Sequence, residues 1–148
     1  MSADYPRFHL ALPVSDLERA AHFYGELLGC PRGRASERWI DFDFFGHQLV
    51  VHLVDEQELP AAARNPVDGE QVPASHFGPI LSWEDFEPLV ERLRAAGIAF
   101  EIEPVRRFAG RRGEQQTLFL TDPCGNYLEF KAFRNIDMLF ASDGLDYP

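Results

Sequence analysis

The sequence predicts an α+β protein made of two βαβββ units that follow one another along the chain. The order strand, helix, then two or three strands occurs twice. Each repeat starts with a strand that carries a histidine, His9 or His76. A glycine that can end the helix, Gly29 or Gly97, follows this histidine at nearly the same distance along the chain in both repeats. Because a single unit of this kind cannot bury its sheet, we expect the two units to pair about a pseudo-twofold axis.

The 148 residues are expected to form a single domain, within which the repeat defines four segments. They are a first unit, a linker, a second unit and an acidic tail: residues 7–54, 55–74, 75–133 and 134–148. The linker holds prolines and acidic residues without a hydrophobic period, so at most one helical turn is expected there, near 60–64. The apolar segment 138–140 in the tail could dock on the core or on a partner subunit.

Within the first unit, the residues favour a helix between strands. Strand patterns occur at residues 8–14, 39–45 and 47–54. Ser15 and Glu18 form a capping-box pattern at the start of a helix over 17–28. The polar stretch 30–37 is expected to form at most a short edge strand.

The second unit shows the same order. Strand patterns occur at residues 76–82, 98–104, 115–121 and 126–133. Asp85 is expected to cap the helix, with Pro88 in its first turn, where a missing N–H costs nothing. Pro104 should close one strand, and 105–114 should be a basic, glycine-containing loop.

The composition excludes several classes of function. A net charge of −10 argues against a general surface for nucleic acid or anionic membranes. No apolar run reaches the length of a membrane span, and no basic segment followed by an apolar one opens the chain. Cys30 and Cys124 form no CxxC motif and are expected to be reduced thiols. The sequence therefore predicts a cytoplasmic protein.

The hairpin at residues 115–131 carries the most informative carboxylate. Asp122 and Pro123 begin its turn, and the second strand alternates, so that Leu128 faces a core while Glu129 faces the other side. A mid-strand carboxylate is costly unless it is paired. A solvated sheet face, with Glu129 paired to Lys131, is the simpler interpretation.

Three side chains of the metal-ligating type share one face pattern. His9, His76 and Glu129 each alternate with large apolar residues, which should turn toward the helices. The apolar sets are Phe8, Leu10 and Leu12, then Phe77 and Leu81, then Leu128 and Phe130. The two histidines and the carboxylate should therefore project from the helix-free side, where together they predict a metal site.

Two segments carry a resemblance to a known family. The segment from Phe8 to Val14, followed by a helix, and the Asp-Pro-x-Gly-Asn-x-x-Glu hairpin at 122–129 resemble the vicinal oxygen chelate superfamily. That superfamily includes glyoxalase I, extradiol dioxygenases, fosfomycin-resistance transferases, methylmalonyl-CoA epimerase and bleomycin-binding proteins. The resemblance covers residues 7–133 and implies two βαβββ modules whose curled mixed sheet surrounds a metal cup.

The resemblance also implies the ligands and the chemistry. By position, the ligands are His9, His76 and Glu129, whereas Val50 stands where glyoxalase I-like members carry a fourth ligand. Two histidines and one carboxylate leave adjacent positions open, which favours Fe(II), with Mn(II), Zn(II) or Ni(II) as alternatives. This pattern favours an oxygenase acting on a small bidentate or aromatic substrate. The alternatives are a lyase or isomerase, a fosfomycin-type thiol transferase, and a non-catalytic protein that sequesters a ligand.

Other residues are candidates for the surroundings of the metal. His52 could be a fourth ligand, a general acid or base, or a structural histidine. Trp39 and Tyr127 are candidates to line the cup and contact the substrate. Arg107, in the basic segment, could bind an anionic group, although a solvated loop explains its charge as well. A homodimer acting on a small molecule is expected.

Overall fold

The computed structural model describes residues 5–61, 63–67 and 69–142. By their contacts these residues form two compact units. The first unit holds the described residues up to Ala61 together with Asp122–Asn126, and the second holds the others. Both units combine a curled mixed sheet with a helical segment, so the predicted α+β class is confirmed. No helix in the described part of the chain is long and apolar enough to cross a membrane.

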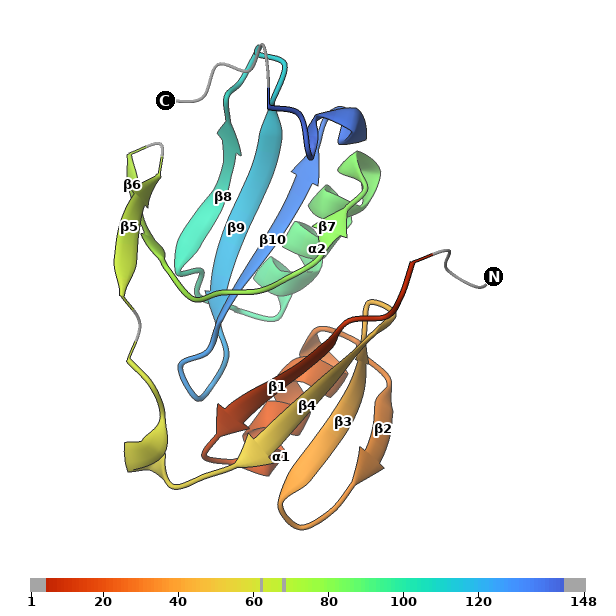
Figure 1. Ribbon diagram of the computed structural model, residues 1–148, viewed down its shortest axis with the longest axis vertical. Coiled ribbons are helices and arrows are strands. Elements are labelled where there is room, and N and C mark those ends of the chain that lie inside the picture. Colours follow the sequence, from red (N-terminus) through yellow and green to blue (C-terminus); the bar gives the residue numbers. More distant parts are fainter. Residues whose placement is uncertain (1–4, 62, 68, 143–148) are drawn as a thin grey trace. The chain divides into compact units, whose positions relative to one another are not determined.

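The first unit has a four-stranded sheet in the order β1-β4-β3-β2 (Figure 1). Its strands are β1 (His9–Val14), β2 (Arg32–Ala35), β3 (Trp39–Phe44) and β4 (His47–Leu53). The outer strand β1 pairs with β4 in parallel, whereas the other neighbours are antiparallel. Alternate side chains of these strands form a core that includes Val14, Phe42, Leu49 and Val51, and Asp41 and Val50 on the other face are buried as well.

The helical segment of the first unit changes register after one turn. It begins as α1 (Leu17–Ala20) and continues as the π-helix η1 (Ala21–Leu27), where the Leu28 N–H donates to the Phe23 carbonyl at 3.0 Å. The wider turn buries Phe23 beside Tyr24. The predicted Ser15 cap is wrong, because the side chain of Asp16 accepts the Arg19 N–H at 3.0 Å.

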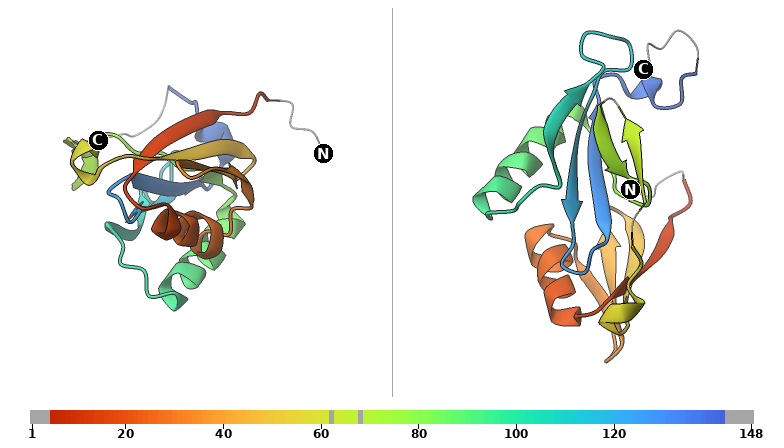
Figure 2. Two further views of the ribbon diagram at one scale, coloured as in Figure 1. Left: turned by 90° about the horizontal axis from the view of Figure 1, so that it is seen from below. Right: turned by 90° about the vertical axis from the view of Figure 1, so that its left-hand side faces the viewer.

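The second unit repeats the arrangement, with the order β7-β10-β9-β8. Its elements are β7 (Ile80–Leu81), α2 (Trp83–Ala95), β8 (Ile102–Arg107), β9 (Gln115–Thr121) and β10 (Tyr127–Phe133). Helix α2 lies along one face of this sheet, against which it packs Phe86, Val90 and Leu93 (Figure 2). The predicted hairpin at 115–131 is confirmed, since β9 and β10 pair in antiparallel register around the turn at 122–126.

Two strand predictions in this unit need correction. The strand expected at 76–82 is reduced to the two residues of β7 and one isolated bridge, between Phe77 and Leu128. The strand expected over 98–104 begins only at Ile102 and continues through Pro104 to Arg107. This is possible because β8 is an edge strand with a register shift at this point, where a proline is tolerated. The predicted basic loop therefore begins only after Arg107.

The second helix also differs at its start. Ser82, rather than Asp85, is the N-cap, and its hydroxyl accepts the Asp85 N–H at 3.2 Å. Pro88 consequently lies inside the helix and not in its first turn. The N-cap is three residues earlier because Ser82 directly follows β7 and is already in an extended conformation.

The predicted linker is structured. A 3₁₀ turn, η2 (Glu56–Glu58), comes before the expected turn near 60–64, which includes a position outside the described residues. A hairpin follows, formed by β5 (Arg64–Val67) and β6 (Glu70–Pro73), and it lies on the side of the sheet opposite α2 (Figure 2). The hairpin is tied to the sheet by Arg64, which contacts Glu101 at 2.6 Å.

Candidate metal centre

Two of the three predicted metal ligands lie side by side in the second unit. His76 Nε2 lies 3.3 Å from Glu129 Oε1. The other ring nitrogen, Nδ1, lies 2.7 Å from the carbonyl oxygen of Pro73. Because a carbonyl can only accept, Nδ1 carries a proton, and Nε2 is the nitrogen that faces Glu129. A metal-binding imidazole is commonly held by its outer nitrogen in this way.

The electrostatics of this pair favour a protonated His76 that donates from Nε2 to an ionised Glu129 in the metal-free chain. The hydrogen bond to Glu129 is the main cause that raises the pKa of His76, although burial opposes it. Burial would raise the pKa of Glu129, but the hydrogen bond from His76 and the charge of Lys131 outweigh it and lower this pKa. A divalent ion would take the place of the proton between the two side chains.

Glu129 is buried rather than solvated, as its 8% exposure shows. The Thr117 hydroxyl donates to Oε2 at 2.5 Å. Lys131 Nζ lies 3.4 Å from Oε1, so the pairing considered in the simpler interpretation does occur, but in a buried setting. The two oxygens thus have separate partners, and Oε1 is the one shared by His76 and Lys131.

Gly78 permits the close approach that brings His76 to Glu129. A Cβ at this position would lie 1.6 Å from the carbonyl oxygen of Glu129. The neighbouring Phe77 donates its N–H to Tyr127 at 3.2 Å and accepts that of Glu129 at 2.8 Å. Only glycine fits between these backbones, and the pair therefore depends on it.

A cavity of about 410 Å³ in the second unit contains the pair. Its walls include polar residues, namely His76, Glu129, Lys131, Arg107 and Gln115. The apolar residues are Val67, Val72, Phe108, Phe119, Phe133 and Leu139. Hairpin β5–β6 contributes two of these, and the tail contributes Leu139, so segments that the sequence predicted as linker and tail form part of the cavity wall.

Arg107 lies in this cavity, although not on the predicted loop. It ends β8 and is 4% exposed. Its Nη1 donates to the carbonyl oxygen of Val67 at 3.1 Å, which connects β8 to the hairpin. Phe119, from the central strand β9, packs edge-on against the His76 ring with 5.0 Å between centroids.

The third predicted ligand, His9, belongs to the first unit. It is exposed on β1, and its Nδ1 lies 2.9 Å from Gln48 Oε1. Phe8, expected to face the helices, precedes β1 and is 65% exposed. Over the described residues, neither unit by itself assembles three His, Cys, Asp or Glu side chains that could hold a metal.

The remaining predicted residues lie in different surroundings. His52 is exposed on β4 and pairs across the sheet with Trp39, over whose ring Arg34 lies at 5.8 Å. Tyr127 begins β10, and its hydroxyl contacts Arg64 at 3.3 Å. The structure thus places Arg107 beside His76 and Glu129, and puts His52 and Trp39 together in the first unit.

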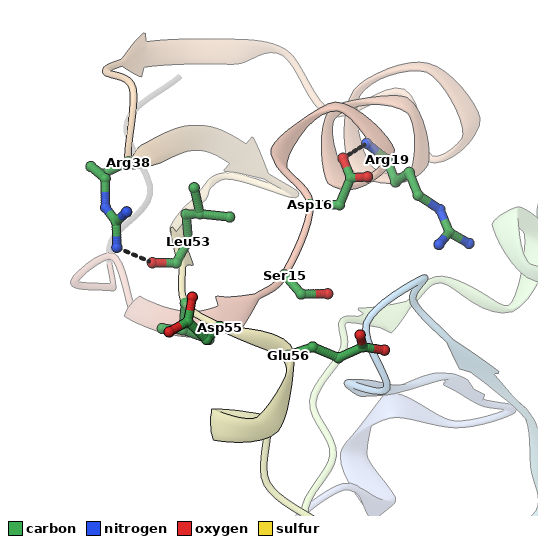
Figure 3. Close-up of a pocket in the computed structure, with 8 residues that line it drawn as sticks. Ser15, Asp16, Arg19, Arg38, Leu53, Asp55 and Glu56 are labelled. Carbon is green, nitrogen blue, oxygen red and sulfur yellow. Dashed lines mark hydrogen bonds between the residues drawn. The ribbon is translucent and has the colours of Figure 1, made fainter.

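A second pocket, of about 470 Å³, lies in the first unit (Figure 3). Its lining is mostly polar and includes Ser15, Asp16, Arg19, Arg38, Asp55 and Glu56. Arg38 donates to the carbonyl oxygen of Leu53 at 3.1 Å. The described lining includes none of the predicted site residues.

Sequence reasoning missed several residues that act on the pair. Thr117 and Pro73 were not singled out, and Lys131 entered only as a partner of Glu129. Thr117 faces Lys131 in the β9–β10 register, so its position could have been inferred once the hairpin was aligned. Pro73 carries no such signal, because its carbonyl is placed by hairpin β5–β6.

Comparison with known proteins assigns the family. A model of the Glyoxalase/Bleomycin resistance protein/Dioxygenase superfamily matches residues 8–130, and the chain belongs to this superfamily. The chain is 31% identical over 123 residues to the glutathione transferase FosA of Serratia marcescens, covering 82% of this chain and 76% of that protein. It is 26% identical over 125 residues to the virulence protein STM3117 of Salmonella typhimurium, covering 84% and 82% of the two chains.

A solved structure agrees with this assignment. The glyoxalase/bleomycin resistance protein/dioxygenase from Alicyclobacillus acidocaldarius superposes with a TM-score of 0.75 at 35% identity, covering 95% of this chain and all of that one. The predicted resemblance to the vicinal oxygen chelate superfamily is therefore confirmed. Members of this superfamily include enzymes, bind divalent metals and commonly act on small molecules as dimers.

Proposed function

We propose that the chain is a metal-dependent enzyme whose divalent ion is held by His9, His76 and Glu129. The observation that carries this proposal is the contact between His76 Nε2 and Glu129 Oε1 inside a cavity. A nitrogen and a carboxylate oxygen directed at one point are a fitting pair of ligands for a divalent ion. His9 supplies the third ligand in this proposal, from the first strand of the other unit.

The donor set limits the choice of metal. Two imidazoles and one carboxylate suit Fe(II), which we favour, and also accommodate Mn(II), Zn(II) or Ni(II). When bound, such an ion polarises the oxygens of a substrate. The protein's own contribution is to hold the ligands and to exclude water, which Phe119 and Phe133 do from the cavity wall.

The cavity indicates the kind of substrate. Its volume suits a small molecule, and most of its wall is apolar. Lys131 and Arg107 add two cationic groups beside the carboxylate. We therefore propose a small, partly apolar substrate that binds through two neighbouring oxygens and carries negative charge.

For the reaction, we favour the opening of an epoxide on such a substrate by a thiol. The C–S bond forms as the ring C–O bond breaks, and the ring oxygen stays on the product as a hydroxyl that takes up the proton of the thiol. The sequence placed an oxygenase first, but the similarity to a glutathione transferase over 82% of the chain changes that order. Lys131 would neutralise the anionic group while the apolar wall keeps water from the reacting carbon. An oxygenase remains the second candidate, because two histidines with one carboxylate and open positions are also the donor set of non-haem Fe(II) oxygenases.

Activity measurements distinguish these reactions. Purified protein is reconstituted anaerobically with Mn(II) or Fe(II), then given glutathione with fosfomycin, or catechols with O₂. We expect thiol adduct formation that is at least about 100-fold slower in His76→Ala. His22→Ala is the matched control, since His22 is exposed and its Nδ1 contacts Glu26 at 2.8 Å within the same helical segment. Metal binding without turnover of either substrate would contradict the enzyme and support a ligand-sequestering protein.

We also propose that the chain forms a homodimer in the cytoplasm. Phe140 is 91% exposed and Ile136 is 57% exposed, so the tail offers apolar surface to a second copy. Light scattering should give twice the chain mass of 16.9 kDa. A single-chain mass at micromolar concentration would contradict the dimer.

A further inference from the structure

Three polar side chains on neighbouring strands form a chain of contacts that ends at His9. The His9 Nδ1 lies 2.9 Å from Gln48 Oε1, and Gln48 Nε2 donates to Asp41 Oδ2 at 3.3 Å. His9 lies opposite Gln48 in the register of β1 and β4, and Asp41 follows on β3. Sheet pairing therefore brings the three side chains together.

The acceptor at the far end sets the direction of this chain. Asp41 forms an ion pair with Arg34, whose Nε lies 3.5 Å from the same Oδ2. A carboxylate only accepts, so Gln48 must present its amide nitrogen to Asp41 and its carbonyl oxygen to His9. That oxygen lies 2.9 Å from His9 Nδ1, a distance at which two acceptors would repel, so Nδ1 carries the proton and donates. The neutral His9 ring then carries its lone pair on Nε2.

The second histidine also has its Nδ1 held as a donor, for a different reason. His76 Nδ1 donates to the carbonyl oxygen of Pro73 at 2.7 Å, and Nε2 faces Glu129. One histidine is thus set by a side-chain relay and the other by a backbone carbonyl, and both present Nε2. Asp41 is only 8% exposed, which is unusual for a carboxylate that would serve a solvated surface.

We propose that Gln48 and Asp41 are positioning residues that hold His9 as the Nδ1–H tautomer and so present Nε2 to the divalent ion. The part of this inference that concerns the ion rests on the proposed function, whereas the tautomer does not. Removing the hydrogen-bond partner of the outer nitrogen of a metal-bound histidine lowers metal affinity by about 10- to 100-fold. If the contact between Gln48 and His9 had no such role, removing it would leave the metal affinity unchanged.

The tautomer can be read from the metal-free protein. Long-range ¹H–¹⁵N spectra recorded at pH 8.5, where imidazoles are neutral, distinguish the two ring nitrogens. We expect His9 as the Nδ1–H tautomer. His47 is an internal reference with the opposite tautomer, because its Nδ1 accepts the Phe8 N–H at 2.8 Å.

Variants separate positioning from general structure. Gln48→Leu should give a mixture of His9 tautomers and weaken Mn(II) binding by about 10- to 100-fold, measured by calorimetry. Gln48→Glu combined with Asp41→Asn should restore both, since the new carboxylate also accepts from Nδ1–H and the new amide donates to that carboxylate. Gln57→Leu, at an exposed position in η2, is the matched control.

The outcomes are distinct. An Nε2–H tautomer at His9 in the wild type, or an unchanged tautomer and Mn(II) affinity in Gln48→Leu, would overturn the inference. If the wild type shows the expected tautomer but binds no Mn(II), the proposed function fails and the inference about the ion fails with it, while the assignment of the tautomer stands. If Mn(II) binds, Gln48→Leu weakens the binding while Gln57→Leu does not, and Gln48→Glu with Asp41→Asn rescues it, the inference is supported.

Discussion

Replacing Gly78 with alanine should disrupt the pairing of His76 and Glu129 without touching either side chain. The added Cβ would lie 1.6 Å from the Glu129 carbonyl oxygen, so one backbone has to move. The movement breaks the two hydrogen bonds that Phe77 makes, from its N–H to Tyr127 and from Glu129 to its carbonyl. Each is worth about 1 kcal/mol, and overpacking adds about 1–3 kcal/mol. We expect a loss of about 3–5 kcal/mol.

Thermal unfolding measures this loss directly. At about 2–4 °C per kcal/mol for a chain of this size, the midpoint of Gly78→Ala should fall by roughly 6–20 °C. Gly25→Ala is the control, because its Cβ would meet Phe42 at an ordinary 3.6 Å. A midpoint for Gly78→Ala within about 1 °C of the control would refute the argument that glycine is required here. Mn(II) binding of the folded variant should be weaker as well.

Three further perturbations test other parts of the structure. Tyr24→Phe should cost about 1.5–3 kcal/mol in urea unfolding at pH 8, since the buried hydroxyl donates to Asp122 at 2.7 Å. Burial and then the charge of Asp122 raise the pKa of Tyr24 above 10.0, so wild-type stability should fall as pH rises above that value and the variant should lack this fall. In the metal-free chain, the His76–Glu129 pair should stabilise the fold most between about pH 4.5 and 6.5. Above this window the stabilisation is lost as His76 loses its proton at its raised pKa. Below this window it is lost as Glu129 gains a proton at its lowered pKa. Urea midpoints of wild type and Glu129→Gln from pH 3 to 9 check this, and a constant difference would contradict it. Lys131→Met should tighten Mn(II) binding about tenfold in calorimetry by removing a cation 3.4 Å from Oε1, and unchanged affinity would show that Lys131 does not oppose the ion.

The sequence predicts the elements whose patterns are local. Alternation and turn chemistry locate the hairpin of β9 and β10 and place Glu129 on the face opposite Leu128. The same alternation does not detect that Gly78 and Pro79 interrupt the strand after His76, or that an edge strand tolerates Pro104. Those outcomes depend on which strand lies beside the residue.

Long-range contacts explain the other differences. The Ser15 hydroxyl is directed at Cys124 Sγ at 3.6 Å, more than 100 residues away in sequence, and Asp16 caps the helix in its place. Likewise, Gln48 could not be connected to His9 before the parallel register of β1 and β4 was known. The sequence thus identifies candidate ligands by residue type and face, while the groups that orient them follow only from strand pairing.

The most direct test of the metal centre is a crystal structure of the protein grown with Mn(II), with anomalous scattering used to locate the ion. We expect one ion per chain, bound by the Nε2 atoms of His9 and His76 and by Glu129. An ion held elsewhere, or no anomalous peak at Glu129 when Mn(II) is in excess, would contradict the proposed site.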